Sequence, residues 1–262
     1  MESKDQKSNV IVEEKLDISS LESVRNAITK NGINAVKNTV LNFDCLEVMK
    51  TFPDKSVDLV LTDPPYEIHA RSGGGLHNSR TWLKDIAEAD LDTFNPYPFL
   101  SEMFRVCKVP HAYIFCSKNL LSQYIDYFKN SDLNWEILIY AKRNPIPTKN
   151  NKYLSDKEYC FFVRGKGCYF NNDRPFEEYK TVQYVNVSEN DLHPAQKDIV
   201  YLERLIAKSS KEGDLILDPF GGSCTTAVAC KQAKRNYICI EKEKRYVQIC
   251  NERLAATSNP LF

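Results

Sequence analysis

The chain has 262 residues, and its 35 basic and 35 acidic side chains cancel to a formal net charge of zero. Hydrophobic residues make up 42% of the chain and charged residues 27%, values typical of a globular protein that argue against global disorder. No apolar run approaches the roughly 20 residues that span a bilayer, and residues 1–17 are charged and aperiodic, with no signal-peptide core. We therefore predict a cytoplasmic protein with a mobile tail at residues 1–17 and one domain at residues 18–262.

Helical and strand patterns alternate along this domain. Ser20 is placed to cap a helix that carries Leu21, Val24 and Ile28 and ends at Gly32. Short apolar β-rich runs predict strands, and helical periodicity predicts helices between them. The predicted strands cover residues 57–62, 111–116, 134–140, 158–163, 214–218 and 237–240, and the predicted helices cover 199–206, 227–232 and 246–254. This alternation is typical of an α/β fold with a mostly parallel, doubly wound sheet.

A short motif, Asp63-Pro64-Pro65-Tyr66, follows the first predicted strand. Ligands of open α/β sheets bind at the carboxyl edge of the strands, so a motif at this position is well placed to bind a ligand and to catalyse a reaction on it. The two prolines lack N–H donors and stiffen the turn, which leaves Asp63 and the Pro64 carbonyl to accept hydrogen bonds. They can accept from the amino group of a planar ligand while Tyr66 stacks on its ring, as nucleic-acid enzymes do with a flipped-out base. A packed proline turn is the alternative.

A second predicted strand end carries a glycine turn. Residues 219–226 read Pro-Phe-Gly-Gly-Ser-Cys-Thr-Thr and join the strand at 214–218 to a helix, an order typical of a nucleotide-type site. The next strand ends at Glu241, where a carboxylate can accept from ribose hydroxyls. No Lys-Ser or Lys-Thr follows the glycines and the dinucleotide glycine signature is incomplete, which argues against ATP and NAD and favours an adenosyl ligand. A purely structural turn is the alternative.

Together the two motifs resemble the β class of S-adenosylmethionine-dependent DNA amino-methyltransferases. In that family D-P-P-Y precedes the target-recognition region, and D-P-F-x-G-S-G-T-T lies near the C-terminus. The resemblance covers roughly residues 40–256, and residues 42–45, 101–108 and 193–197 fit the family's G-D turn, its next helix and its H-P-T-Q-K segment in order. The chain departs from the family pattern at Cys224, where the last glycine of G-S-G-T-T is expected, and at Asn42, Ala195 and Asp198.

The resemblance implies a Rossmann-like methyltransferase fold, with residues 139–192 as an inserted target-recognition region. It implies that Asp63, Pro64, Pro65 and Tyr66 are catalytic. The S-adenosylmethionine site is expected to use Asp44, Asp63, Asp218, Phe220, Gly221, Gly222, Ser223, Thr225, Glu241, His193, Gln196 and Lys197. In this set Asp44 is expected at the adenine, Glu241 at the ribose, and residues 193–197 at the methionine end.

Basic residues gather in one part of this neutral chain. Residues 139–168 contain seven bases and two acids, interleaved with Asn and aromatic residues. Such a patch beside a base-accepting pocket can hold phosphates, and Asn and Arg can read base edges. We predict double-stranded DNA as the partner, contacted by Arg71, Lys142, Arg143, Lys149, Asn150, Asn151 and Lys152. A solvated surface loop is the alternative.

Other residue patterns complete the prediction. The glycine-rich residues 67–78 follow the catalytic turn, and we interpret them as a lid that closes on the flipped base. The four histidines lack metal-binding spacing, so we predict no metal. The nine cysteines include no C-x-x-C pair, and we interpret them as small buried residues of a reducing cytosol.

The predicted reaction is direct attack of an exocyclic amine on the sulfonium methyl of the cofactor, with Asp63 and the Pro64 carbonyl accepting the amine hydrogens. The absence of a Pro-Cys dipeptide disfavours methylation of cytosine C5. D-P-P-Y is more typical of adenine N6 enzymes in the family, so adenine N6 is the predicted acceptor and cytosine N4 the alternative. A catalytically impaired nucleic-acid-binding protein on the same fold is the alternative of another class, and an RNA or protein amine is a third. The target sequence, a homodimer and a partner restriction endonuclease stay open.

Overall fold

The computed structural model of the protein describes residues 16–65, 94–145, 153–186 and 197–257. Almost all of the predicted tail lies outside these ranges, and so does the predicted lid at residues 67–78. The helix predicted near the start of the domain is present as α1, Leu21–Asn31, with Ser20 as its N-cap and Gly32 as its C-cap.

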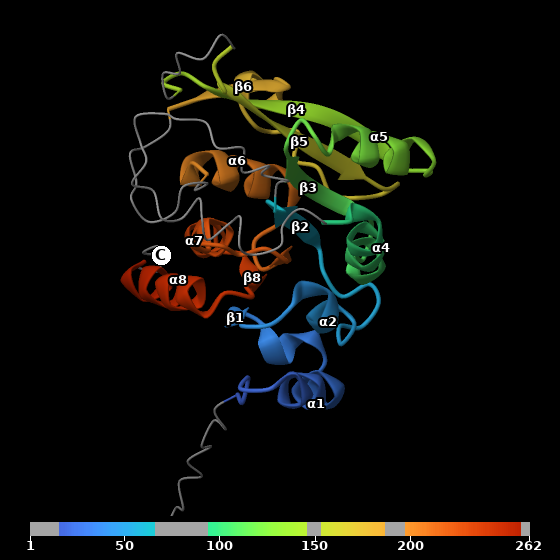
Figure 1. The fold of residues 1–262 in the computed structure, drawn as a ribbon, viewed down its shortest axis with the longest axis vertical. Helices are drawn as coiled ribbons and strands as arrows, with labels where there is room; N and C mark the ends of the chain where they lie inside the picture. Colours follow the sequence, from blue (N-terminus) through green and yellow to red (C-terminus); the bar gives the residue numbers. More distant parts are fainter. Residues whose placement is uncertain (1–15, 66–93, 146–152, 187–196, 258–262) are drawn as a thin grey trace, which may run out of the picture.

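A single sheet organises the described residues into an α/β fold (Figure 1). Its eight strands lie in the order β1-β8-β7-β2-β3-β5-β4-β6. The run from β1 to β3 is parallel, β5 is antiparallel to both of its neighbours, and β6 is parallel to β4. The strands are β1 Thr39–Leu41, β2 Leu59–Thr62, β3 His111–Cys116, β4 Asn134–Lys142, β5 Lys157–Arg164, β6 Val182–Val185, β7 Leu215–Asp218 and β8 Asn236–Ile240. The predicted mostly parallel sheet is confirmed.

Helices cover both faces of the sheet (Figure 1). One face packs against α1, α2 Cys45–Met49, α4 Pro96–Val106 and α5 Leu121–Lys129, and the other against α6 Ile199–Ser209, α7 Thr225–Gln232 and α8 Lys244–Ala256. Two separate buried clusters result, because successive side chains of a strand point to opposite faces. In β2, Val60 belongs to the first cluster, and Leu59 and Leu61 belong to the second. The doubly wound arrangement is confirmed.

The chain reverses its direction across the sheet between β2 and β7. These two strands are paired in the centre of the sheet; the chain continues from β2 toward β3 on one side and from β7 to β8 on the other. Ligands of open α/β sheets bind in the crevice at such a switch point, outside the carboxyl ends of the strands. Residues 63–65 and the turn at residues 219–224 both lie at this edge.

Strands β5 and β6 fall within residues 139–192, the predicted target-recognition region, and both belong to the central sheet. That segment therefore includes part of the sheet as well as surface loops, and the domain division stays a prediction. One departure from the family pattern has a local explanation: Asp198 caps α6, because its carboxylate accepts from the Tyr201 N–H at 2.7 Å.

Candidate active site

The two strand-end motifs, 156 residues apart in the chain, are joined by a buried hydrogen bond. The Thr62 hydroxyl donates to Asp218 Oδ1 at 2.9 Å, and the Phe220 N–H donates to the same oxygen at 3.1 Å. Burial raises the pKa of Asp218 to about 6, and the hydrogen bonds from Thr226, Thr62 and Phe220 oppose this shift. Asp218 thus fixes the end of β2, immediately before Asp63, against the glycine turn.

A chain of alternating charges surrounds Asp63. The Lys197 ammonium contacts Asp63 Oδ2 and lies 2.8 Å from Glu158 Oε2, and Lys142 Nζ lies 2.5 Å from Glu158 Oε1. Burial opposes ionisation of Glu158, but the Lys197 and Lys142 ammonium groups outweigh it and lower the pKa of that carboxyl to about 2. The structure therefore brings Lys197 to the Asp63 carboxylate. Sequence analysis missed Glu158, which has no motif around it.

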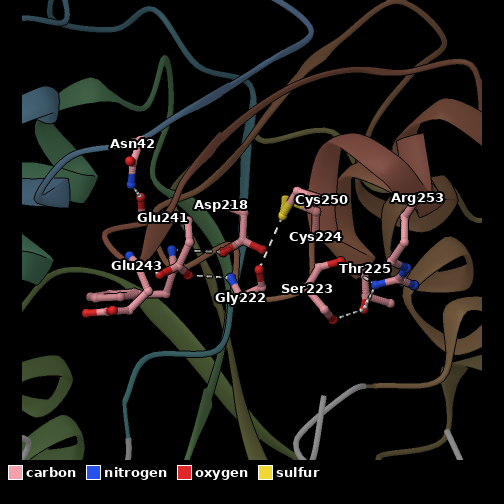
Figure 2. Close-up of a disulfide and its surroundings, with 11 residues drawn as sticks. Asn42, Asp218, Gly222, Ser223, Cys224, Thr225, Glu241, Glu243, Cys250 and Arg253 are labelled. Carbon is pink, nitrogen blue, oxygen red and sulfur yellow. Dashed lines mark hydrogen bonds between the residues drawn. A yellow bond between two sulfur atoms is a disulfide. The ribbon is translucent and has the colours of Figure 1, made fainter. Parts of the chain in front are cut away.

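The glycine turn presses closely against β8. The Gly221 N–H donates to the Ile240 carbonyl at 2.8 Å, and a Cβ at Gly221 would lie 3.3 Å from the Cys239 Cβ. Glu241 accepts from the Gly222 N–H at 2.7 Å with Oε2 and from the Glu243 N–H at 2.8 Å with Oε1 (Figure 2). Burial raises the pKa of Glu241, and these backbone donors oppose the shift. The carboxylate is thus held at the turn, and its predicted role at a ribose stays a prediction.

A disulfide joins Cys224 of the turn to Cys250 of α8, so the prediction that all nine cysteines are unpaired is wrong for these two (Figure 2). The other seven cysteines are free, and all but Cys168 are buried. Cys224 has φ +57°, in the left-handed region that favours glycine. Cys224 thus has a backbone conformation that favours glycine, and its side chain forms a cross-link.

Helix α8 also holds the turn through Arg253. Its guanidinium donates to the Ser223 carbonyl and to the Thr225 hydroxyl, the latter at 3.3 Å (Figure 2). Cys250 and Arg253 are three residues apart and so lie on one face of the helix. Sequence analysis missed both residues, because nothing in a helical pattern indicates which distant turn a helix face will meet.

Asp44 lies at the same sheet edge, after β1, which pairs with β8. Its Oδ1 caps α2 by accepting from the Leu46 N–H at 2.9 Å and the Glu47 N–H at 3.3 Å. The Asn42 amide donates to the Glu241 carbonyl at 2.8 Å and to the Lys242 carbonyl at 2.9 Å. Asn42, which stands where the family has glycine, thus ties the Asp44 turn to the end of β8.

The predicted DNA-contacting residues are only partly described. Lys142 is engaged with Glu158, and the Arg143 guanidinium lies over the Tyr184 ring at 5.5 Å. The predicted site residues outside the described ranges are Tyr66, Arg71, Lys149, Asn150, Asn151, Lys152, His193 and Gln196. The roles assigned to all of these residues stay predictions.

Within the described ranges, none of the helices has the length and apolar character that a crossing of the bilayer requires. In those same ranges, no three His, Cys, Asp or Glu side chains are grouped so that they could hold a metal ion.

The described residues have a Rossmann-like methyltransferase fold, with a carboxylate and a glycine turn at the switch point, where open α/β sheets bind ligands. The chain belongs to the DNA methylase family of N6 and N4 methyltransferases, which matches residues 57–252.

Relatives and solved structures agree with this assignment. The putative methylase YubD of Escherichia coli (strain K12) is 30% identical over 83% of this chain and 90% of its own. The type II methyltransferase M2.DpnII of Streptococcus pneumoniae is 29% identical over 87% of this chain and 94% of its own. The crystal structure of M1.HpyAVI with S-adenosylmethionine superposes with a TM-score of 0.62 at 25% identity, covering 82% of this chain and 98% of its own. The cytosine-N4-specific PvuII methyltransferase shares the fold, with a TM-score of 0.65 at 17% identity over 86% of this chain and 88% of its own.

Proposed function

We propose that this DNA methyltransferase transfers the methyl group of S-adenosylmethionine to the exocyclic N6 amine of an adenine flipped out of double-stranded DNA. One observation carries the proposal: Asp63 and the glycine turn meet at the switch point of the sheet, linked through Thr62 and Asp218. Cytosine N4 is the second candidate acceptor, because the family includes N4 enzymes. Incubation with labelled cofactor and DNA, followed by nucleoside mass spectrometry, separates N6-methyladenine from N4-methylcytosine.

The residues of the turn fit an adenosyl cofactor. Each oxygen of the Glu241 carboxylate accepts one backbone N–H, and an ionised carboxylate oxygen can accept a second hydrogen bond. A ribose diol can therefore donate to Glu241 without displacing the turn. Asp44 is proposed at the adenine. The proposed methionine side comprises Asp218, Phe220, Gly221, Gly222, Ser223 and Thr225, with His193 and Gln196 covering it.

The bound cofactor supplies a methyl group activated by a sulfonium. Asp63 and the Pro64 carbonyl accept the two hydrogens of the acceptor amine, which localises the nitrogen lone pair and points it along the line of attack. The rigid Pro64-Pro65 pair holds these acceptors in place, and Tyr66 stacks on the flipped base. Tyr66→Ala is expected to lose about 1–3 kcal/mol of base stacking.

Glu241→Ala is expected to weaken S-adenosylmethionine binding by roughly 1–3 kcal/mol, because hydrogen bonds to a charged group are lost. Calorimetry measures the affinity. Glu243→Ala is the matched control, because it removes a neighbouring exposed carboxylate at the same helix end and should bind like the parent. Thermal unfolding of both variants checks that the turn persists without the bond to Gly222. Unchanged affinity in Glu241→Ala would place the ribose at another strand end.

Neutralising Lys149 and Lys152 together is expected to weaken DNA binding for all sequences. Each lost phosphate contact should flatten the slope of log affinity against log salt by about 0.9, because fewer counterions are released. The control is Lys30→Ala with Lys50→Ala, two exposed lysines on α1 and after α2, at the opposite end of the molecule from β4 and β6 (Figure 1). If the Lys149/Lys152 variant keeps the parent slope and affinity, this segment is a solvated loop and target reading lies near Arg71.

Variants of Arg143, Asn150 and Asn151 separate base reading from phosphate binding. If these residues read base edges, their substitution should change which sites are methylated, at roughly 1–3 kcal/mol per contact. Sequencing of methylated sites measures the change.

We also propose a cytoplasmic location, and two further possibilities stay open: a homodimer and a partner restriction endonuclease. The name of M2.DpnII as a type II methyltransferase supports the last of these. Light scattering tests the dimer, and resistance of methylated DNA to an endonuclease of the same specificity tests the partner.

A further inference from the structure

The charges around Asp63 come from four separate elements. Asp63 follows β2, Lys197 precedes α6, Glu158 is on β5, and Lys142 ends β4. Lys197 lies at the centre of the group, 6% exposed, with its ammonium on both carboxylates and 4.7 Å from the centre of the Phe115 ring. A buried ammonium is costly unless it is paired, so this arrangement holds Lys197 in one place.

We propose that Lys197 is a positioning residue for the catalytic carboxylate: it keeps Asp63 ionised and oriented at the acceptor amine, while Glu158 and Lys142 balance its charge. The inference rests on the proposed function of Asp63. It assigns to Lys197 a task different from the cofactor contact that the H-P-T-Q-K resemblance implies.

The reaction needs the Asp63 carboxylate, because a protonated carboxyl has one oxygen that donates instead of accepting. A cation within hydrogen-bond distance favours the ionised form of an acid. Burial alone would lower the pKa of Lys197, but Asp63 and Glu158 raise it above its ordinary value. Lys197 therefore stays charged, and it serves as a fixed cation and not as an acceptor of the amine's proton.

Among the described residues, the charge of Asp63 also reaches other titratable groups and raises the pKa of each. These groups include Cys116 of β3, Cys160 of β5, Tyr124 of α5 and Asp218 of β7. Burial, with Asp63, raises the pKa of Cys116 to about 12, so this thiol is neutral near pH 7. Burial and, to a smaller extent, the charge of Asp63 raise the pKa of Asp218 to about 6, so the titration of Asp218 is followed beside that of Asp63 in each variant.

The test compares Lys197→Met with Lys197→Arg and with Lys208→Met. Lys208 is a matched control because it is also 6% exposed, and its ammonium contacts the Glu178 carbonyl, away from Asp63. In Lys197→Met, Glu158 keeps Lys142 while Asp63 loses the Lys197 ammonium, and loss of a nearby cation favours the protonated form of an acid. In the profile of kcat against pH, the fall in rate on the acid side, the acid limb, should move to higher pH by about 1–3 pH units. The cofactor Kd should stay within a few-fold of the parent's. Lys197→Arg should restore the limb, and Lys208→Met should leave it in place.

A second variant and a second measurement keep the inference testable if Lys197→Met does not fold. Glu158→Gln keeps Lys197 and removes its other counter-charge, so the acid limb should stay or move to lower pH. Carbon-13 NMR of labelled aspartates, with Asp63 assigned from Asp63→Asn, reports the titration of this carboxyl in each folded variant without turnover. A parent enzyme that methylates no DNA contradicts the proposed function, and the NMR titration still decides the inference.

Three results overturn the inference. If Lys197→Met loses cofactor affinity but keeps the parent acid limb and Asp63 titration, Lys197 belongs to the cofactor site. If the limb, the titration and the affinity are all unchanged, or if Glu158→Gln moves the limb upward, the ion pairs support the fold alone.

Discussion

Asp63→Ala should lower methyl transfer by about 10²–10³-fold or more, the range for removing one preorganised group that stabilises a transition state. Cofactor affinity and folding should stay close to those of the parent. The physical reason is that Asp63 acts on the acceptor amine, while Lys197 keeps Glu158 as a counter-charge when Asp63 is lost. Transfer of label from S-adenosylmethionine to DNA measures the first quantity, and calorimetry measures the second.

Asp54→Ala provides a matched control. It removes another carboxylate that has a basic partner, Arg105, but Asp54 is exposed and lies before β2, at the opposite end of the strand from Asp63. Its methyl transfer should equal that of the parent. Near-normal turnover in Asp63→Ala would remove the catalytic assignment. Inactivity of both the parent and the variant on every DNA tested would favour the alternative of an impaired nucleic-acid-binding protein.

Loss of the Cys224–Cys250 disulfide should destabilise the protein by roughly 3 kcal/mol, because the cross-link closes a loop between residues 26 apart and restricts the unfolded chain. That is a large share of the roughly 5–15 kcal/mol by which a domain is stable. Denaturant unfolding with and without a phosphine reductant measures the difference. Cys250→Ala serves as the control, since its stability should not respond to the reductant. If the free energy of unfolding of the parent is the same with and without the reductant, this prediction is contradicted.

Two substitutions separate the cross-link from the backbone of the turn. Cys250→Ala and Cys224→Gly both abolish the disulfide, but Cys224→Gly also removes a side chain from a left-handed residue, a conformation that costs about 1–2 kcal/mol with a Cβ. Cys224→Gly should therefore be the more stable of the two by about that amount. Cofactor calorimetry on the same pair shows how far the glycine turn depends on its anchor to α8. Equal stabilities would mean that the turn relaxes without the cross-link.

Local patterns predicted the elements that have a strong apolar signal or clear cap residues, but not all of the others. The helix α1 has a serine cap, an apolar stripe and a terminal glycine within a few residues, and the buried strands are continuous apolar runs. Strand β1 has only three residues, and edge strand β6 alternates exposed and covered side chains without a strong apolar signal. Pairing with neighbouring strands, and not their own sequence, makes these segments part of the sheet.

The sequence by itself determined the chemistry at the two strand ends. Asp63-Pro64-Pro65 and the glycine turn are contiguous residues, so their donors, acceptors and stiff backbone can be read locally. Only the tertiary structure decided that Lys197 meets Asp63, 134 residues away, and Glu158, and that Cys250 and Arg253 anchor the turn. Those contacts depend on strand order and on which helix covers which face. No local pattern encodes them, because they arise from burial and charge pairing between segments that become neighbours when the sheet forms.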